Sequence, residues 1–309
     1  MPCERSMNIF GAVKRVCASR GIHPRRWWTG VRSYSRFVGF VKPHLMAASE
    51  EEYKVRRELL VPAWKSRKLE IPVGRRILAI SPHPDDESIG AGGLLWAHRN
   101  LAEIHFIVLT NGGNGGRLEN EMPDGELAKR KMAEVRKSEL ARTSEALGVR
   151  SLQFLGFPDG AVGFDNEAVQ RLRECVAKIG PDVVLLPWFL DNHFDHRQAN
   201  VLYALSCSEF ETLVLAYEIW SLLEPNAIFD ITEHLDAKLA LVRNYASQLR
   251  TVDYVNYARG LAQVRAYHTP VNPTRTGAVE GYIALPNRDY CDLVFRMYGL
   301  EGKSSTGGR

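Results

Sequence analysis

Short apolar runs alternate with longer amphipathic stretches along the chain from residue 76 onward. The short runs are rich in Ile, Leu, Val and Phe and are typical of strands buried on both faces, whereas apolar residues recur with helical period in the longer stretches. The predicted strands are 77–81, 104–110, 152–157, 183–188 and 213–220. The predicted helices are 88–99, 125–147, 167–179 and 197–207. This alternation predicts an α/β fold in which a Rossmann-like, mostly parallel sheet carries helices on both faces.

The pattern is looser on either side of this region. Helical periodicity returns late in the chain, with a short strand after it, and a run of mixed charge near residue 60 also favours a helix. These late and early elements are predicted at 232–249, 254–267, 281–285 and 49–68. The chain then divides into a basic, partly helical N-terminal extension (1–72), one α/β domain (73–300) and a disordered tail (301–309).

The composition is that of an ordinary globular protein. The chain has 309 residues, of which 45% are hydrophobic and 25% charged, so it can form one large core. Its five cysteines are scattered without a CxxC pair, and an odd number cannot all pair with one another. We therefore expect a reduced protein without a disulfide framework, in which any metal ion is bound by His and carboxylate side chains.

Positive charge is concentrated near the N-terminus. Residues 1–48 contain nine Lys and Arg and one Glu, a net charge of +8 (9 − 1), while the rest of the chain carries −4 (31 − 35). Four interpretations stay open: a flexible basic tail, attachment to anionic lipid, an organelle-targeting peptide and a nucleic-acid-binding arm. No stretch approaches the roughly 20 apolar residues of a membrane span. We expect a cytoplasmic protein without a nucleic-acid partner, with peripheral membrane contact through residues 1–48 as an alternative.

Two polar clusters follow predicted strands. The sequence PHPDDE occupies 82–87, directly after the first strand, and DNHFDH occupies 191–196, shortly after the fourth. In open α/β sheets, ligands bind beyond the carboxyl ends of the strands. We therefore look for a functional site where these two clusters meet.

Both clusters contain side chains that bind metal ions. A catalytic zinc site typically has three protein ligands from His, Asp or Glu and leaves one position open for water. His83 and Asp86 lie three residues apart at the start of a predicted helix, and His196 lies in the second cluster, so these residues are candidate ligands of one ion. Zn2+ would lower the pKa of a bound water toward about 7, and Fe2+ is an alternative that suits similar ligands.

The remaining polar residues of the clusters suggest acid–base chemistry. Asp85 is adjacent to a candidate ligand and is a candidate general base for the water. His193, held by Asp195, could stabilise developing negative charge or donate a proton to a leaving amine. Each cluster alone also has a simpler interpretation, because aspartates often cap helices and polar residues often begin them. The occurrence of both clusters at strand ends favours the metal site.

The two clusters resemble the hallmark motifs of the PIG-L/LmbE-like deacetylase family. Residues 83–87 read HPDDE and residues 193–196 read HxDH, with Phe194 where the family commonly has Pro. Further likeness lies in the RxxE sequence at 136–139, the FPDG at 157–160, and Lys238 with the YxSQ at 245–248. The resemblance covers about residues 75–285 and implies a zinc-dependent hydrolase that removes acetyl groups from N-acetylglucosamine-containing sugars or glycoconjugates.

The resemblance also implies a role for each motif residue. His83, Asp86 and His196 match the zinc ligands, and Asp85 matches the catalytic base. His193, oriented by Asp195, matches the residue that stabilises the tetrahedral intermediate. Arg136 and Asp159 match positions that hold sugar hydroxyls or a phosphate. For Arg136 the simpler alternative is an ion pair with Glu139 on the surface of a helix.

Two other functions stay open at this point, and several weaker signals accompany them. The chain could be a metalloamidase that acts on a non-sugar amide, or a non-catalytic binding protein whose metal ion is structural. The glycine-rich sequence at 111–116 lacks the lysine of a phosphate-binding loop, so we expect a mobile loop near the metal ion. Trp96, Trp188 and Trp220 stand at positions typical of a core.

Overall fold

The computed structural model describes residues 66–116, 125–269 and 274–300. The basic segment 1–48, most of the helix predicted at 49–68 and the tail 301–309 lie outside the described residues, so their proposed roles stay predictions. In the part of the chain that is described, no helix is long and apolar enough to cross a membrane.

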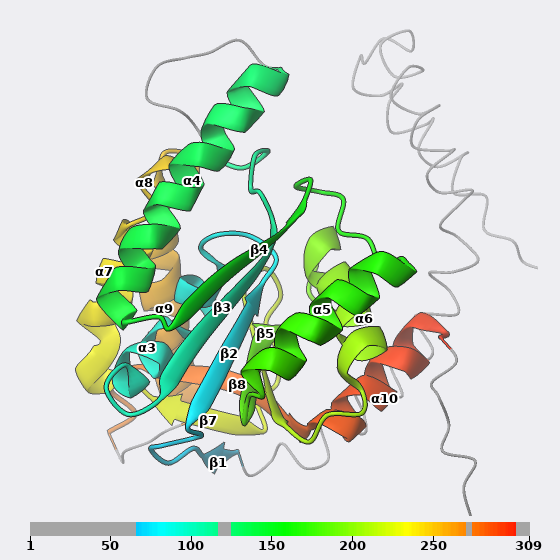
Figure 1. Ribbon diagram of the computed structural model, residues 1–309. Helices are drawn as coiled ribbons and strands as arrows, with labels where there is room; N and C mark the ends of the chain where they lie inside the picture. The colour runs from blue at the N-terminus through cyan, green and yellow to red at the C-terminus, as the bar shows by residue number, and fades with distance from the viewer. Residues whose placement is uncertain (1–65, 117–124, 270–273, 301–309) are drawn as a thin grey trace, which may run out of the picture. The chain divides into compact units, whose positions relative to one another are not determined.

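One mixed sheet organises the described residues (Figure 1). Its strands follow in the order β1-β7-β8-β6-β5-β2-β3-β4. β8 is antiparallel to both of its neighbours, and every other pair is parallel, as predicted. The strands are β1 (Arg67–Lys68), β2 (Arg76–Ser81), β3 (Glu103–Thr110), β4 (Ser151–Phe157), β5 (Val183–Pro187), β6 (Leu213–Tyr217), β7 (Ala227–Asp230) and β8 (Val279–Pro286).

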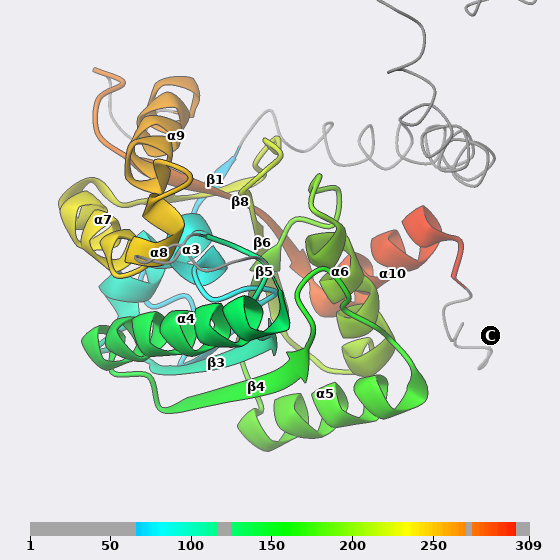
Figure 2. The same cartoon turned by 90° about the horizontal axis from the view of Figure 1, so that it is seen from above.

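Helices cover both faces of the sheet, as Figures 1 and 2 show. One face carries α3 (Asp86–His98), α4 (Glu126–Leu147), α7 (Leu235–Arg243), α8 (Ala246–Leu249) and α9 (Tyr254–His268). The other face carries α5 (Asn166–Ile179), α6 (Phe194–Cys207) and α10 (Asn287–Tyr298). The two-layer covering confirms the α/β class, and the short turn η2 (Thr232–His234) leads into α7.

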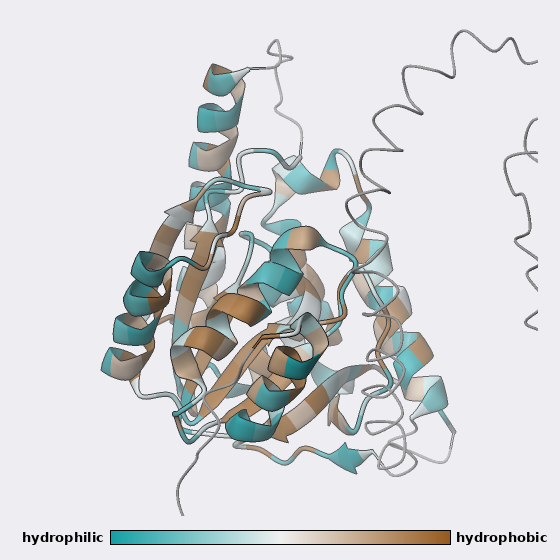
Figure 3. Ribbon diagram, turned by 90° about the vertical axis from the view of Figure 1, so that its right-hand side faces the viewer, coloured by the Kyte–Doolittle hydropathy of each residue, from teal (hydrophilic) through white to brown (hydrophobic). Residues whose placement is uncertain are grey.

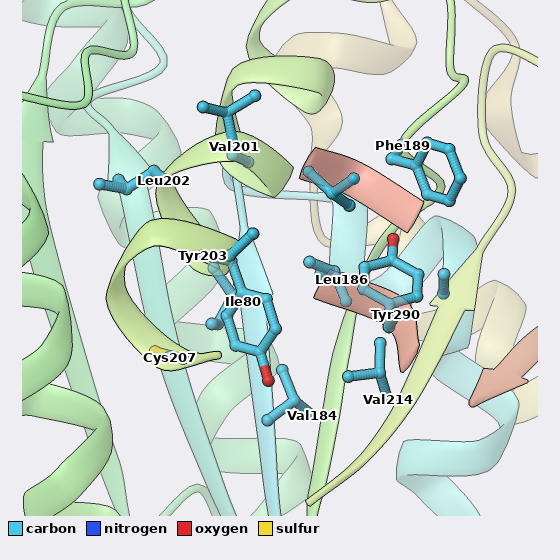
Figure 4. Packing of buried hydrophobic residues seen from close by; sticks show 14 of the residues in the cluster. Ile80, Val184, Leu186, Phe189, Val201, Leu202, Tyr203, Cys207, Val214 and Tyr290 are labelled. Atoms are coloured by element: carbon cyan, nitrogen blue, oxygen red, sulfur yellow. The ribbon is translucent and has the colours of Figure 1, made fainter. Parts of the chain in front are cut away.

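Each central strand feeds two hydrophobic cores. In β2, Leu78 and Ile80 belong to the core under α5, α6 and α10, while Ile77 and Ala79 belong to the core under α3, α7 and α9. Successive side chains of a strand point to opposite faces, so a strand buried on both sides reads as a continuous apolar run. Figure 3 shows these apolar strands between helices with polar outer surfaces, and Figure 4 shows Ile80 within the first core.

Within the described residues, the structure differs from the predicted elements mainly before β2 and after β6. The predicted helix at 232–249 is interrupted before α8, where Tyr245 has non-helical torsion angles (φ −91°, ψ 56°). β1 pairs with β7 inside the stretch predicted as helix, so the sheet begins before residue 73. β7 and α10 were not predicted, because β7 is a four-residue strand and α10 follows β8 without a separating turn.

A buried ion pair supports the irregular helix α3 on one face of the sheet. α3 is kinked at Ala91 (φ −134°), which frees backbone amides in its middle. The two oxygens of Glu280 accept hydrogen bonds from the amides of Gly93 (2.8 Å) and Leu94 (2.9 Å). Lys238 Nζ lies 2.6 Å from Glu280 Oε1, and both side chains are almost fully buried. This carboxylate of β8 therefore replaces the helical hydrogen bonds that the kink removes.

Replacing Lys238 with Met is expected to destabilise the protein by about 3–5 kcal/mol, because it leaves the Glu280 carboxylate buried without its cation. The matched control is Lys129→Met, which removes an exposed pair with Glu126 (3.7 Å) and should cost about 1 kcal/mol or less. Denaturant unfolding of both variants measures the difference. Equal stability of the two variants would show that the buried pair contributes no more than the exposed one.

Candidate active site

The two polar clusters lie at the same edge of the sheet because their strands are neighbours. β2 and β5 are parallel and in direct register, with Ile77 opposite Val183. The chain continues from β2 into α3 and from β5 into α6, on opposite faces of the sheet. β3 and β4 lie to one side of β2, and β6 lies beyond β5. Such a reversal of strand order opens a crevice at the carboxyl ends of the two strands.

Three histidines meet at this edge. The ring centroids of His83 and His193 are 4.7 Å apart, those of His193 and His196 are 4.8 Å apart, and those of His83 and His196 are 5.6 Å apart. Each ring offers a nitrogen atom within 4.8 Å of the others. His196 is fully buried and His83 nearly so, whereas His193 is half-buried. The cluster is therefore closed to solvent at His83 and His196 and partly open to solvent at His193.

Asp86 joins two of these histidines. Its Oδ2 atom lies 3.2 Å from His83 Nδ1 and also accepts the His83 backbone amide (2.8 Å). Its Oδ1 atom lies 3.3 Å from His196 Nε2. The structure thus brings His83, Asp86 and His196 together, with the carboxylate between the two rings. Among the described residues, the sets whose donor atoms all lie within 4.8 Å of one another are the three histidines and His83 with Asp159 and Asp195; the two aspartates lie on the opposite edge of the His83 ring from Asp86.

The arrangement of His83, Asp86 and His196 fits a divalent cation. His196 is fully buried, yet neither of its ring nitrogens has a hydrogen bond of standard geometry with the described residues. Burial disfavours the charged ring, but Asp86 and Asp191 raise the pKa of His196 to about 9. Burial also opposes ionisation of Asp86, but His196 and His83 hold its pKa well below the usual range. A buried carboxylate between two histidine rings is a site where a metal ion can bind, because metal binding displaces protons from such ligands.

The contacts of Asp195 differ from the predicted ones. Its Oδ2 atom lies 3.0 Å from His83 Nε2, not against His193, and it accepts the amide of Gly160 (2.7 Å). His193 is the N-cap of α6, and its Nδ1 atom accepts the backbone amide of Asp195 (3.2 Å). The loop after β4 brings amides to the carboxylate and turns it toward His83. The carboxylate of Asp195 therefore orients His83, and the backbone orients His193.

Asp85 has an unusual backbone conformation. Its φ of 134° lies in a region that side chains other than glycine rarely adopt, and such strain costs about 1–3 kcal/mol. Its side chain makes no capping hydrogen bond to α3, so the simpler interpretation as a helix cap does not apply. Burial raises its pKa to about 7, with Arg136 opposing and Asp86 adding to the shift. The carboxylate is thus held beside the histidine cluster without serving the helix.

Arg136 holds the Asp85 carboxylate in place through a hydrogen bond. One guanidinium nitrogen, Nη2, donates to the Pro84 carbonyl (2.7 Å) and to Asp85 Oδ1 (3.0 Å), while Nη1 donates to the Gly112 carbonyl (3.1 Å). The side chain is 3% exposed, so its charged group is not open to a substrate as the sequence suggested. The alternative pair with Glu139 is also absent, because that carboxylate accepts the backbone amide and hydroxyl of Ser247.

Asp159 is likewise engaged by the protein. Its Oδ1 atom lies 3.3 Å from His83 Nε2, and its Oδ2 atom accepts the backbone amide of Asn114 (3.0 Å). Asn114 belongs to the glycine-rich loop, whose other residues pack closely on α4 and α8. A Cβ atom at Gly116 (φ 77°) would lie 2.3 Å from the side-chain nitrogen of Gln248. The glycines therefore allow close packing, which is a different role from that of a free loop.

The sequence analysis assigned no role to Asp191 and placed Trp220 in the core. Asp191 is fully buried, with Oδ1 3.3 Å from His196 Nδ1, and its place in the second polar cluster was a signal for it. Trp220 was predicted to be in the core but is 47% exposed, because β6 ends at Tyr217. Its ring meets that of Tyr254, 6.0 Å away. Burial, with the Asp85 and Asp86 carboxylates adding to the shift, raises the pKa of Tyr254. Trp188, by contrast, is buried as predicted.

Comparison with known proteins identifies the region that contains both clusters. The family model described as PIG-L: GlcNAc-PI de-N-acetylase matches residues 78–205. A diacetylchitobiose deacetylase of Thermococcus kodakarensis is 28% identical over 194 residues, which cover 56% of this chain and 70% of the relative.

Solved structures share the fold. The N,N'-diacetylchitobiose deacetylase of Pyrococcus horikoshii matches with a TM-score of 0.60 and 24% identity, over 78% of this chain and 94% of that chain. GalB, the 4-carboxy-2-hydroxymuconate hydratase of Pseudomonas putida KT2440, matches with a TM-score of 0.55 and 21% identity, over 68% of this chain and 96% of that chain. The same fold therefore serves a deacetylase and a hydratase, so the reaction has to be argued from the site.

Proposed function

Residues 78–205 form a PIG-L family domain, and on that premise we propose that the chain removes the acetyl group from an N-acetylated amino sugar or glycoconjugate. The matching family and the Thermococcus kodakarensis relative are deacetylases, so the chain is a metal-dependent hydrolase of amide bonds. One observation carries the proposal further. The buried Asp85 carboxylate stands next to Asp86, which lies between the rings of His83 and His196.

The proposed metal ligands are His83, Asp86 and His196. A zinc ion held there would supply Lewis acidity, which polarises an acetamide carbonyl and makes water a stronger acid. Two histidines and one carboxylate also suit ferrous iron, so elemental analysis of the purified protein decides between the two metals. Asp195 would keep the His83 ring in place through Nε2, which leaves Nδ1 to face Asp86.

Asp85 would act as the general base. Its carboxylate accepts the proton of the attacking water and then returns that proton to the amine that leaves, so that acetate and a free amino sugar are released. The hydrogen bond from Arg136 fixes the carboxylate in one orientation throughout. The side chain of Asp85 makes no hydrogen bond to the amides of α3, so its carboxylate is not occupied as a helix cap.

His193 would stabilise negative charge on the acetamide oxygen as a neutral donor. Its Nδ1 atom already accepts a backbone hydrogen bond, so the ring proton lies on Nε2. Burial and the neighbouring His83 and His196 lower its pKa, which favours the neutral ring. A hydrogen bond from Nε2 to the developing oxyanion then requires no further charge in the site. Of the two roles that the sequence left open for His193, this proposal takes the stabilisation of negative charge and assigns the proton transfer to Asp85.

The proposal is tested with the purified, zinc-loaded protein and a set of amides. We expect free amine and acetate to appear with N-acetylglucosamine, diacetylchitobiose and N-acetylglucosaminyl glycosides, and to disappear after treatment with a chelator. Hydrolysis of non-sugar amides alone would favour the metalloamidase. Water addition to 4-carboxy-2-hydroxymuconate without any amide hydrolysis would favour the hydratase chemistry of GalB. Tight metal binding with neither activity would favour a non-catalytic binding protein.

A further inference from the structure

We infer that Asp191 is a positioning residue for the metal centre: its carboxylate holds Nδ1 of His196 and thereby directs Nε2 of that ring to the metal ion. The inference rests on the proposed role of His196 as a ligand and adds a residue to which no role was assigned from the sequence. It concerns how firmly the ion is bound, so it can be tested without measuring deacetylation.

The first support is the position of the two His196 nitrogens. Asp191 Oδ1 lies 3.3 Å from Nδ1, and Asp86 Oδ1 lies 3.3 Å from Nε2. All three side chains are buried, and His196 and Asp191 have no exposed surface. Neither nitrogen has a hydrogen bond of standard geometry with the described residues, so neither is committed to another partner. One nitrogen can therefore bind the ion beside Asp86 while the N–H of the other donates a hydrogen bond to Asp191.

The second support is the rigidity of Asp191. Its Oδ1 atom accepts the backbone amide of His193 (2.8 Å). Its Oδ2 atom accepts the amides of Trp220 (2.9 Å) and Ser221 (3.2 Å), which lie beyond β6. Among the described residues, the Asp191 carboxylate has its ion pair with His196. Amides from two separate segments thus fix the carboxylate, and its charge is directed at the imidazole.

The contact between Asp191 and His196 is of a kind that is common in metal sites. A histidine ligand commonly donates its second ring proton to a carboxylate, which fixes the tautomer and makes the coordinating nitrogen more basic. Asp195 stands in the same relation to His83, with Oδ2 3.0 Å from Nε2. Each of the two proposed histidine ligands therefore contacts a buried aspartate through the ring nitrogen that does not face Asp86. Through Trp220, Asp191 also ties the ligand to an exposed aromatic ring at the sheet edge.

Asp191→Asn in the full chain is the decisive variant. The carboxylate receives donors on both oxygens, and an amide has only one oxygen, so neither orientation of Asn satisfies both sides. We expect the affinity for Zn2+ to fall by about 10- to 100-fold, as is usual when such outer contacts are lost. Competition with a chromophoric chelator measures this affinity. The thermal unfolding of the metal-free proteins shows whether the variant is folded.

Asp182→Asn is the matched control. Asp182 also accepts two backbone amides, those of Arg75 (3.0 Å) and Arg76 (2.9 Å), but it lies at the opposite edge of the sheet. We expect this variant to keep the wild-type affinity for Zn2+. If Asp191→Asn is folded and binds Zn2+ as tightly as the control, the inference is wrong and Asp191 has only a structural role.

A measurement on the wild-type protein covers the case in which Asp191→Asn does not fold. Nitrogen-15 NMR of the histidines in the zinc-loaded chain is expected to show His196 with a protonated Nδ1 and a metal-bound Nε2. Coordination through Nδ1 would overturn the inference. Absence of Zn2+ binding by the wild-type protein would instead contradict the proposed function, so the two failures are distinguishable.

Discussion

Asp85→Asn is expected to lower kcat by about 100- to 10,000-fold while the metal ion stays bound, because the variant loses the proposed general base and keeps the proposed ligands. Asn is the informative substitution, since Asn and Asp adopt positive φ more readily than other side chains and the φ of Asp85 is 134°. An amide of the same shape also keeps an oxygen for Arg136, 3.0 Å away. Steady-state kinetics and elemental analysis on the same preparation measure both quantities.

Asp253→Asn is the control for this prediction. Asp253 caps α9 by accepting the amide of Asn256 (3.1 Å), at an exposed position, so its loss should leave kcat unchanged. Turnover by Asp85→Asn within a few-fold of this control, with metal bound, would remove Asp85 from the role of base. Loss of the metal ion from Asp85→Asn would instead place it among the ligands.

His196→Ala is expected to abolish stable metal binding and, with it, turnover. Loss of a direct ligand should weaken binding by more than the roughly 10- to 100-fold that loss of an outer contact costs. The variant also leaves Asp86 and Asp191 facing each other across a buried space without the ring between them. Elemental analysis after dialysis gives the metal content, and added Zn2+ tests whether turnover can be rescued.

His105→Ala separates loss of a ligand from loss of a buried imidazole. His105 is also buried, on β3, where its Nδ1 atom lies 2.7 Å from the Ser151 hydroxyl. Glu103, 3.8 Å from its ring, marks the start of that strand, opposite the edge with the metal site. This variant should keep its metal ion. Wild-type metal content in His196→Ala would exclude His196 as a ligand.

The sequence predicted the centre of the fold because strands buried on both faces leave an unmistakable apolar run. Ile77 to Ile80 alternate between two cores, so every position of the run is apolar, and the order of strands and helices then confirms the α/β class. The two polar clusters could also be paired in advance, since both follow parallel strands. The elements that were missed, β7 and α10, lack either length or a boundary that a sequence pattern can show.

The hydrogen bonds within the site could not be predicted in the same way. Asp195 lies two residues from His193 in the sequence, but two amides of the loop after β4 turn its carboxylate toward His83. Arg136 lies on a helix whose amphipathic pattern indicates a buried face, and yet no pattern shows that Asp85 ends beside it. Such contacts depend on how separate elements meet, which is a property of the folded chain.

Glu280 has a consequence for the smallest part of the chain that can work as an enzyme. It lies far beyond the matched region at 78–205, yet its two oxygens complete the helix that begins with Asp86. A fragment that stops at residue 205 would leave the Gly93 and Leu94 amides unsatisfied and one face of α3 uncovered by α7. The residues proposed for the chemistry lie between His83 and His196, but the scaffold that supports them is completed only by the late strand β8.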